Sequence, residues 1–572
     1  MLERQAERPA FLTLWGEYGT LVAYFSEEAA MSKKKKQQPI QIKKSRFGLE
    51  DIFLLVCSVI SIFITYYATK YCIDSDASSE LVLANHLAEN GGILTADWGY
   101  STELRVINTQ LVYAPLFKIF KDWHMVRFFG ALILQAILVG SYYVFTKATG
   151  ISKKIFCISS GLFLLPVSVC YGRIVLYNCY YVPHIAISMV IAGLVFAKNE
   201  GRSITWIVVR TLALLVLSFL GGLGGIRQGM MTHAPLLLAV FIYFAMDDFV
   251  CKREAGEHSK KRLGYLLNAI GSAGGFFLGF LVNTNVLAKQ YEFSDYSENM
   301  VGLLDVSYFK NISYGLMHHL GFRDEVKLIS TLGILSVLAV FLTIACIIVA
   351  IVQIVKYKEH KDVSKALPSV MFLSFLAVML LVFCVLGKYY YYVLYFTPVV
   401  AWFIPVFVQT FVERPKDAKG LNMRRVLPVV AVVVIFLNGA VNGSYYKDHT
   451  KYEQKYEGLV FTDREITWKL EPVVDFLVES GYDRGYAHFW NANIITEMSD
   501  GAVRFVNVHV DNLARISFNP WLCLKTNRTL EGTKDFLLLE AGQRASFESK
   551  NDLSRVRLVY QDENYVIYAI QK

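Results

Sequence analysis

Three carboxylates stand close together just after the first long apolar segment of the chain. Asp74 and Asp76 form an Asp-Ser-Asp motif, and Glu80 follows four residues after Asp76. A carboxylate placed there can take the proton of a hydroxyl group as that hydroxyl attacks an electrophilic carbon. Paired carboxylates can also hold a divalent cation such as Mg²⁺ or Mn²⁺ through hard oxygen ligands. We therefore expect Asp74 and Asp76 to be catalytic, and to be the metal ligands if the protein uses a metal.

The segments around this motif predict a membrane protein. Apolar residues make up 54% of the 572 residues and charged residues only 18%, and windows such as 332–355 and 368–386 contain no charge. Each window can cross a bilayer core of about 30 Å. We predict eleven spanning helices, near residues 52–71, 125–146, 155–171, 183–197, 205–221, 232–246, 265–287, 328–355, 367–386, 391–411 and 426–443.

Basic residues predict the orientation of these spans. A lysine run at residues 33–36 precedes the first span, and every second loop after it carries Lys and Arg. The positive-inside rule places those loops in the cytoplasm and the long loops 72–124 and 288–327 outside. An odd number of spans then predicts a multi-pass protein of the plasma membrane, with its N-terminus inside and its C-terminal part extracytoplasmic. The formal net charge of +9 is spread over short loops and forms no continuous basic face, so we expect a lipid bilayer and no nucleic acid as partner.

Three regions follow from this pattern. Residues 1–50 form a basic cytoplasmic segment, 51–444 a multi-span domain, and 445–572 a small α/β domain. Translation could begin at Met1 or at Met31, which directly precedes the basic run. In the last region, apolar periodicity predicts one long helix, five strands and a short helix between the first two strands. The long helix is expected at 464–480, and the strands at 486–490, 503–510, 536–539, 556–560 and 565–570.

The position of the Asp74/Asp76 pair resembles the GT-C superfamily of membrane glycosyltransferases, which carry an acidic residue or a DxD-like pair in the first external loop. Two further stretches look similar. One is the glycine-rich run 221–228 at an outer helix end, and the other is Lys388 with the tyrosines that follow it. The resemblance implies a bacterial-type, inverting enzyme that transfers a hexosyl or pentosyl sugar from a polyprenyl-phosphate carrier to a cell-envelope glycan or other outer acceptor. The family is divided on metal dependence, so the resemblance leaves the cation open.

A departing polyprenyl phosphate leaves negative charge near the membrane surface, and a fixed cation would stabilise it. Arg227 is the first choice, because its guanidinium can bind phosphate oxygens in a bidentate manner and glycines surround it. Trp490, at the end of a predicted strand, could offer its ring to a sugar or be buried beneath a helix. The expected substrate-binding residues are Glu80, Arg105, Arg227, Gln228, Lys388, Tyr389 and Trp490.

Two groups of residues stay undecided at this point. His318 and His319 lie in the second long outer loop, and Arg173, Tyr177 and His184 lie between the third and fourth predicted spans.

Two functions of other classes compete with the enzyme. A transporter or flippase for a lipid-linked sugar would place ionisable groups near mid-membrane or repeat its helices in two halves. The sequence shows neither, and its charged residues cluster at span ends, which favours the enzyme. A non-enzymatic envelope assembly factor would leave Asp74 and Asp76 dispensable.

Overall fold

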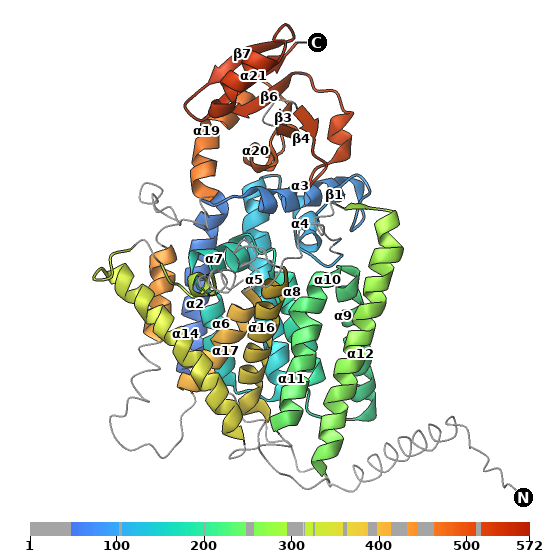
Figure 1. Ribbon diagram of the computed structural model, residues 1–572, viewed down its shortest axis with the longest axis vertical. Helices are drawn as coiled ribbons and strands as arrows, with labels where there is room; N and C mark the ends of the chain where they lie inside the picture. The colour runs from blue at the N-terminus through green and yellow to red at the C-terminus, as the bar shows by residue number, and fades with distance from the viewer. Residues whose placement is uncertain are drawn as a thin grey trace, which may run out of the picture.

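A computed structural model of the chain has a helical bundle with an α/β unit at one end (Figure 1). It describes residues 47–571 apart from 102–103, 105, 200, 247–256, 294–312, 314, 324–325, 358–362, 387–396, 413–431, 444–462 and 511–515.

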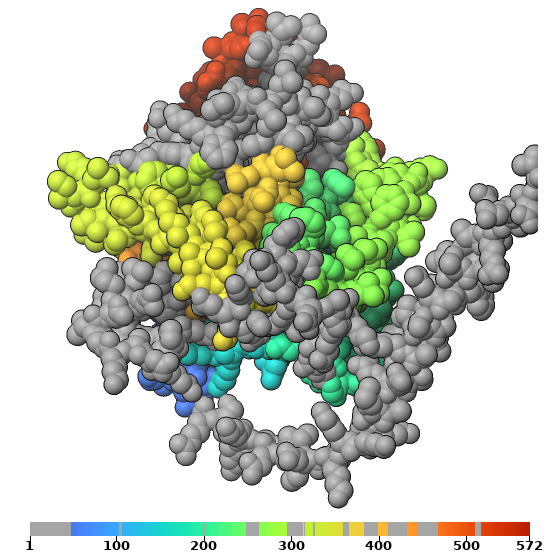
Figure 2. Space-filling view, turned by 60° about the horizontal axis from the view of Figure 1, so that its bottom comes forward, coloured from blue at the N-terminus to red at the C-terminus, as the bar shows by residue number. Residues whose placement is uncertain are grey.

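The bundle is built from long apolar helices. Seven helices within the described ranges are long and apolar enough to cross a membrane. Phe341 on α14 and Phe277 on α12 are more than half exposed, as lipid-facing side chains would be. Figure 2 shows α14, α16, α11 and α12 side by side along one flank. The bundle helices are α2 (Leu49–Tyr71), α5 (Trp123–Thr149), α6 (Lys153–Phe163), α8 (Val182–Val195), α9 (Ile204–Leu223), α11 (Ala234–Ala245), α12 (Glu257–Asn285), α14 (Thr331–Val355), α16 (Val363–Leu386), α17 (Thr397–Val412) and the helix Val432–Gly443.

The third and fourth predicted spans differ from the prediction. Helix α6 ends at Phe163, three residues before Pro166, and the chain resumes as α7 (Val169–Tyr171) and the π-helical turn η1 (Gly172–Tyr177). The segment Val169–Tyr177 is bent by 80° against α8. Pro166 has no N–H to donate, which explains the first interruption. Within the described ranges this bent pair would add an eighth span, and the count of eleven and its parity stay predictions.

The first long outer loop is largely structured. It contains α3 (Ser75–Asn90), β1 (Gly99–Tyr100) and α4 (Gln110–Phe117), and α3 lies across the end of the bundle beneath the α/β unit (Figure 1). Strand β1 pairs in parallel with β2 (Glu292–Phe293) from the second long outer loop. The two loops therefore meet at the same end of the bundle. Shorter turns near this end are α10 (Ile226–Gln228), η2 (Gly229–His233) and η4 (Leu287–Lys289).

The C-terminal unit is a six-stranded sheet with helices on both faces. The strand order is β5-β4-β3-β6-β8-β7, with β4, β3 and β6 parallel. One face packs on α19 and α20 around Leu470, Ile495 and Phe536, and the other packs on Phe547 of α21. The elements are α19 (Asp463–Glu479), β3 (Arg484–Ala487), α20 (Phe489–Met498), β4 (Arg504–Val510), β5 (Ile516–Phe518), η8 (Lys525–Arg528), β6 (Asp535–Glu540), η9 (Ala541–Gln543), α21 (Arg544–Lys550), β7 (Val556–Gln561) and β8 (Tyr565–Ile570).

The five predicted strands lie close to where their alternation places them, with one informative error, and the short strand β5 was not predicted. The predicted strand 486–490 ends instead at Ala487, and Phe489 already begins α20. Trp490 therefore stands on the first turn of a helix and not at the end of a strand. An apolar run of this length fits either element, and the helix is stabilised by packing against α3 that local sequence does not reveal.

A buried ion pair joins the C-terminal unit to the bundle. Both carboxylate oxygens of Glu497 on α20 accept hydrogen bonds from the guanidinium of Arg127 on α5, and Ser78 Oγ donates to the same carboxylate at 2.6 Å. Arg127 is fully buried and Glu497 is 4% exposed. Ile73, in the linker between α2 and α3, also packs into the core of the C-terminal unit.

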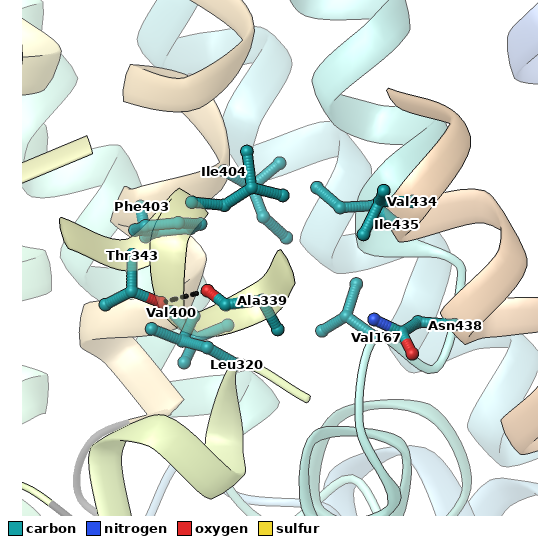
Figure 3. A pocket seen from close by; sticks show the side chains of 11 residues that line it. Val167, Leu320, Ala339, Thr343, Val400, Phe403, Ile404, Val434, Ile435 and Asn438 are labelled. Carbon is teal, nitrogen blue, oxygen red and sulfur yellow. Dashed lines mark hydrogen bonds between the residues drawn. The ribbon is translucent and has the colours of Figure 1, made fainter. Parts of the chain in front are cut away.

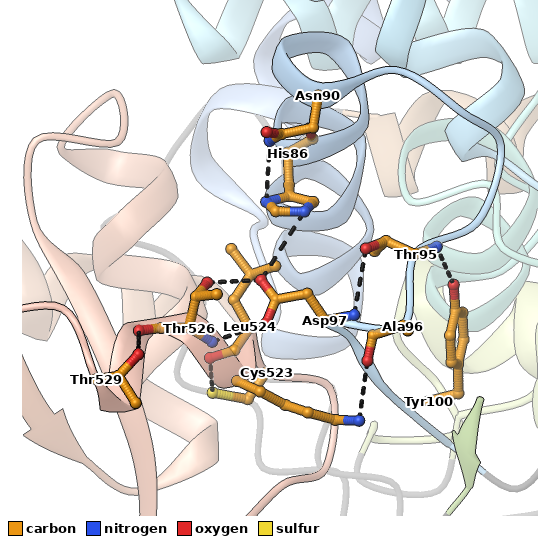
Figure 4. Close-up of polar contacts among 11 residues, drawn as sticks. His86, Asn90, Thr95, Ala96, Asp97, Tyr100, Cys523, Leu524, Thr526 and Thr529 are labelled. Atoms are coloured by element: carbon orange, nitrogen blue, oxygen red, sulfur yellow. Dashed lines mark hydrogen bonds and ion pairs between the residues drawn. The ribbon is translucent and has the colours of Figure 1, made fainter. Parts of the chain in front are cut away.

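A second junction holds the first outer loop to the same unit (Figure 4). The side chain of Asp97 accepts from Thr526 N at 2.8 Å and from Thr526 Oγ1 at 2.5 Å. Lys525 Nζ donates to Ala96 O at 2.9 Å. Gly99 exchanges backbone hydrogen bonds with residues 522 and 523, and a Cβ there would lie 1.7 Å from Pro520 O. Only glycine permits this close approach.

Glu497→Gln should lower the stability of the whole protein by about 3–5 kcal/mol, because it leaves a buried guanidinium without a counter-charge. Thermal unfolding of the purified protein in detergent measures this. The matched control is Glu548→Gln, which removes a partly exposed ion pair with Arg544 in the same unit and should leave stability almost unchanged. Equal effects of the two substitutions would contradict the assigned role of Glu497.

Candidate active site

Asp74 sits at the point where the membrane helix α2 gives way to α3. It is the N-cap of α3, and its Oδ1 accepts a hydrogen bond from Ala77 N at 2.8 Å. Capping by aspartate satisfies one of the unpaired N–H groups at a helix start. The side chain is only 3% exposed. Asp74 is therefore fixed in position and largely removed from solvent.

The π-helical turn η1 and the bend between η1 and α8 supply the other partners of Asp74. Arg173 Nε donates to Oδ2 at 2.8 Å, and Arg173 Nη2 forms an ion pair with the same oxygen at 2.8 Å. Asn178 and Tyr180 donate to the same oxygen through Nδ2 and the phenol. Cys179, between them, has a φ of 60°, a left-handed conformation that turns the chain back toward α8. The break in the helix thus exists where three donors converge on one buried carboxylate.

Arg227 contacts Tyr181, the residue that follows Tyr180 in the chain. Its Nη1 donates to the phenol of Tyr181 at 3.1 Å, and its guanidinium lies 5.7 Å from that ring's centre. The rings of Tyr180 and Tyr181 are 6.4 Å apart at nearly right angles. Asp74 and Arg227, 153 residues apart in the chain, are therefore connected through two adjacent tyrosines. Arg227 remains partly exposed.

Asp76 and Glu80 lie on the first two turns of α3, and each is partly exposed. The N-terminal end of a helix favours negative charge, so Asp76 is placed where its carboxylate is stabilised. Glu80 accepts hydrogen bonds from Asn108 Nδ2 at 2.9 Å and from Thr109 Oγ1 at 2.5 Å. Glu80 thereby holds the start of α4 against α3. Its expected contact with substrate stays a prediction.

The glycine-rich run has a different structural basis from the one we expected. A Cβ on Gly222 would lie 2.1 Å from Phe276 O, so this glycine allows α9 and α12 to pack closely. Gly225 has a φ of 91° and reverses the chain before α10. Gln228 is buried in the bundle, where its Oε1 lies 2.6 Å from His184 Nδ1. The glycines place Arg227 at a sharp turn through helix packing.

Trp490 lies beside the start of α3. Its carbonyl oxygen accepts a hydrogen bond from Ser75 Oγ at 2.7 Å, and its side chain is 48% exposed. The alternative of a Trp buried beneath a helix is therefore wrong, and an exposed indole stands next to the Asp74/Asp76 segment.

The structure does not describe three of the expected residues, and it gives the two undecided histidines a structural role. Arg105, Lys388 and Tyr389 lie outside the described residues. His318 and His319 are buried, and burial lowers the pKa of His318 to about 4 and that of His319 to about 3, so both are neutral. His319 Nε2 lies 3.1 Å from Cys170 Sγ, which is a structural contact.

Sequence analysis left Arg173 undecided and missed Asn178, Tyr180 and Tyr181. The available signal was a polar, aromatic stretch between two apolar segments.

The partners of Asp74 do not suit a metal site. A cation at Oδ2 would compete with the guanidinium of Arg173. Among the residues that the structure describes, no three His, Cys, Asp or Glu side chains gather closely enough to hold a metal ion. The positive charge that balances Asp74 is that of Arg173.

An apolar cavity lies deeper in the bundle between α14, α17 and the helix Val432–Gly443 (Figure 3). Its volume is about 20 Å³, which is room for about one water molecule. Asn438 lines this cavity, and its side-chain oxygen has no hydrogen-bond partner in the structure. The cavity as formed is too small for a lipid chain.

Comparison with solved structures identifies the fold. The structure of ArnT from Cupriavidus metallidurans bound to undecaprenyl phosphate matches with a TM-score of 0.52 over 92% of this chain and 98% of that one, at 10% identity. The apo state of ArnT (TM-score 0.48, 91% and 97% covered, 10% identity) and the Archaeoglobus fulgidus oligosaccharyltransferase complex with zinc and sulfate (0.44, 91% and 73%, 12%) also match. No protein-family model and no curated protein matches the sequence. The match to ArnT shows that the chain shares the overall fold of that membrane protein.

Asp74→Asn should destabilise the protein by about 2–4 kcal/mol, because an amide cannot balance the Arg173 charge and turns a donor toward other donors. Asp76→Asn, on the partly exposed side of α3, should change stability by less than about 1 kcal/mol. Thermal unfolding in detergent compares the two variants. Equal losses would show that Asp74 has no special role in holding the bent segment.

Proposed function

We propose that this ArnT-like membrane protein is a glycosyltransferase that moves a sugar from a polyprenyl-phosphate carrier to an acceptor of the cell envelope. The observation that carries the proposal is the juxtaposition of Asp74, Asp76 and Arg227 at one end of the bundle. The fold neighbour ArnT, solved with undecaprenyl phosphate, supports a polyprenyl-phosphate donor. The basic loops support an active site on the extracytoplasmic face of the plasma membrane.

Within this proposal the two aspartates have different roles. Asp76 is partly exposed at the helix start and acts as the general base. Asp74, whose carboxylate is surrounded by donors, is a positioning residue that holds α3 and the bent segment together. The burial of Asp74 supports this division, because a base must reach the hydroxyl whose proton it takes.

The proposed reaction is a single displacement. The acceptor hydroxyl oxygen forms a bond to the anomeric carbon while the bond from that carbon to the phosphate oxygen breaks. The hydroxyl proton passes to Asp76, and the polyprenyl phosphate leaves with its negative charge next to Arg227. Attack opposite the leaving group inverts the anomeric configuration. Trp490 supplies an exposed ring beside α3 on which a sugar can stack.

A transporter of lipid-linked sugars fits the structure less well. Interrupted helices of transporters place their breaks near mid-membrane. Here the break is tied to Asp74, three residues beyond the end of α2, and so lies at the end of the bundle. Transfer of label from donor to acceptor in detergent, where no two sides exist, would distinguish the enzyme from a transporter.

Asp76→Asn should reduce sugar transfer by about 10²–10⁴-fold while the protein stays folded, because the base is lost. The assay follows release of polyprenyl phosphate from a polyprenyl-phosphate-sugar donor by purified protein, and the cell-envelope glycan is compared in parallel. Glu531→Gln, an exposed acid between η8 and β6 of the α/β unit, is the control and should keep full transfer. Unchanged transfer by Asp76→Asn would refute the assignment of the base.

Arg227→Gln should weaken binding of the polyprenyl phosphate product about tenfold or more, because a charge-assisted contact to phosphate is lost. Inhibition of transfer by added polyprenyl phosphate measures this affinity. The control is Arg202→Gln, which changes an arginine stacked on Trp206 at the opposite end of α9. Equal product inhibition in both variants would remove Arg227 from the donor site.

A further inference from the structure

A polar groove of about 450 Å³ lies away from the aspartates. Three segments form it: the C-terminal half of α3, the turn between α4 and α5, and the turn that follows α20. Its lining residues are Asn85, Ala88, Glu89, Phe117, Lys118, Phe120, Lys121, Trp123, Asp500 and Gly501.

The groove is distinct from the candidate active site. Asn85 is nine residues after Asp76 on α3, which corresponds to about 14 Å along the helix axis and a rotation of about half a turn. The groove and Asp76 therefore lie on opposite faces of α3. A ligand in the groove does not contact the reacting groups.

The groove stands at the level where the membrane begins. Trp123 is the first residue of α5, one of the seven apolar helices long enough to span a bilayer. Ile119, four residues before Trp123, is 70% exposed, and Phe129, six residues after Trp123 on α5, is 37% exposed. Exposed apolar side chains at the start of a span face lipid. A lipid beside α5 would thus have its headgroup at the groove and its chains along these residues.

The charges of the groove are mixed in sign. Lys118 and Lys121 stand exposed in the turn before α5, and Glu89 and Asp500 face them from α3 and from the C-terminal unit. Asp500 is held in place by Trp123 N, which donates to its Oδ1 at 2.8 Å, and Asn85 donates to Glu89 at 3.0 Å. Two cations suit a phosphate, whereas two carboxylates repel a purely anionic ligand and suit an ammonium group.

We propose that this groove binds the headgroup of an amino-phospholipid of the surrounding membrane. The phosphate lies between Lys118 and Lys121, the ammonium group lies against Glu89 and Asp500, and the acyl chains run along Ile119 and Phe129. The lipid spans the junction between α3, α5 and the C-terminal unit. The bound lipid therefore contacts α3, α5 and the C-terminal unit in one arrangement, and by mass action it stabilises that arrangement.

The test uses the purified full chain in detergent, with short-chain phosphatidylethanolamine, phosphatidylglycerol, diacylglycerol and inorganic phosphate as probes. Native mass spectrometry measures bound lipid, and thermal unfolding measures stabilisation. Phosphatidylethanolamine should bind best, and Lys118→Gln/Lys121→Gln should weaken its binding about tenfold or more. Lys147→Gln/Lys154→Gln, which changes a lysine at the opposite end of α5 and one at the start of α6, removes the same charge and should leave binding unchanged.

Glu89→Gln supplies an independent arm. It should reduce the preference for phosphatidylethanolamine over phosphatidylglycerol, because a carboxylate facing the ammonium group is lost. Three results would overturn the proposal: unchanged binding in the Lys118/Lys121 variant, equal loss in the Lys147/Lys154 control, or the same stabilisation by inorganic phosphate alone. Sugar transfer is not read in this experiment, so its outcome is independent of the proposed enzyme activity.

Discussion

The arrangement of this end of the molecule depends on the neutralisation of one buried carboxylate. Asp74 has almost no access to water, and a buried charge is costly unless it is paired and hydrogen-bonded. Arg173, Asn178 and Tyr180 meet that requirement, and they can do so only because the helix is interrupted between η1 and α8. The interruption in turn brings Tyr181 beside Arg227. One electrostatic requirement thus explains the bent helix, the start of α3 and the position of the phosphate-binding candidate.

The α/β unit completes this arrangement from the other side. Ser75 and Ser78 of α3 both bond to α20, and Arg127 of α5 pairs with Glu497 of the same helix. Helix α3 therefore lies between two surfaces that each hold it by buried polar contacts. Removing one partner of a buried polar contact costs far more free energy than losing a hydrophobic contact of similar area. The polar contacts therefore specify a single orientation of α3. The orientation of Asp76 follows from this.

Much of this could be predicted from the sequence where the signal is local. Charge-free windows predicted most bundle helices, alternation predicted the strands, and the position of Asp74 and Asp76 after the first span predicted the fold resemblance. The partners of Asp74 could not be predicted, because they lie 99 to 106 residues away and no periodicity connects them to it. The same limit explains Trp490, whose helix depends on contacts with α3, and Gly222, whose role depends on Phe276. Long-range polar pairing was the missing information.

The linker between α2 and α3 ties two different environments together. Ile73 is packed in the hydrophobic core of the α/β unit, and Asp74, the next residue, is bonded to the bundle. Consecutive Cα atoms are about 3.8 Å apart, so these two residues cannot separate. Any tilt of the α/β unit on the bundle must either carry Asp74 with it or break its bonds to Arg173. The orientation of the α/β unit is consequently coupled to the position of the Asp74 carboxylate. A molecule that binds the α/β unit and changes or fixes its orientation therefore changes the geometry of the bent helix without contacting that helix.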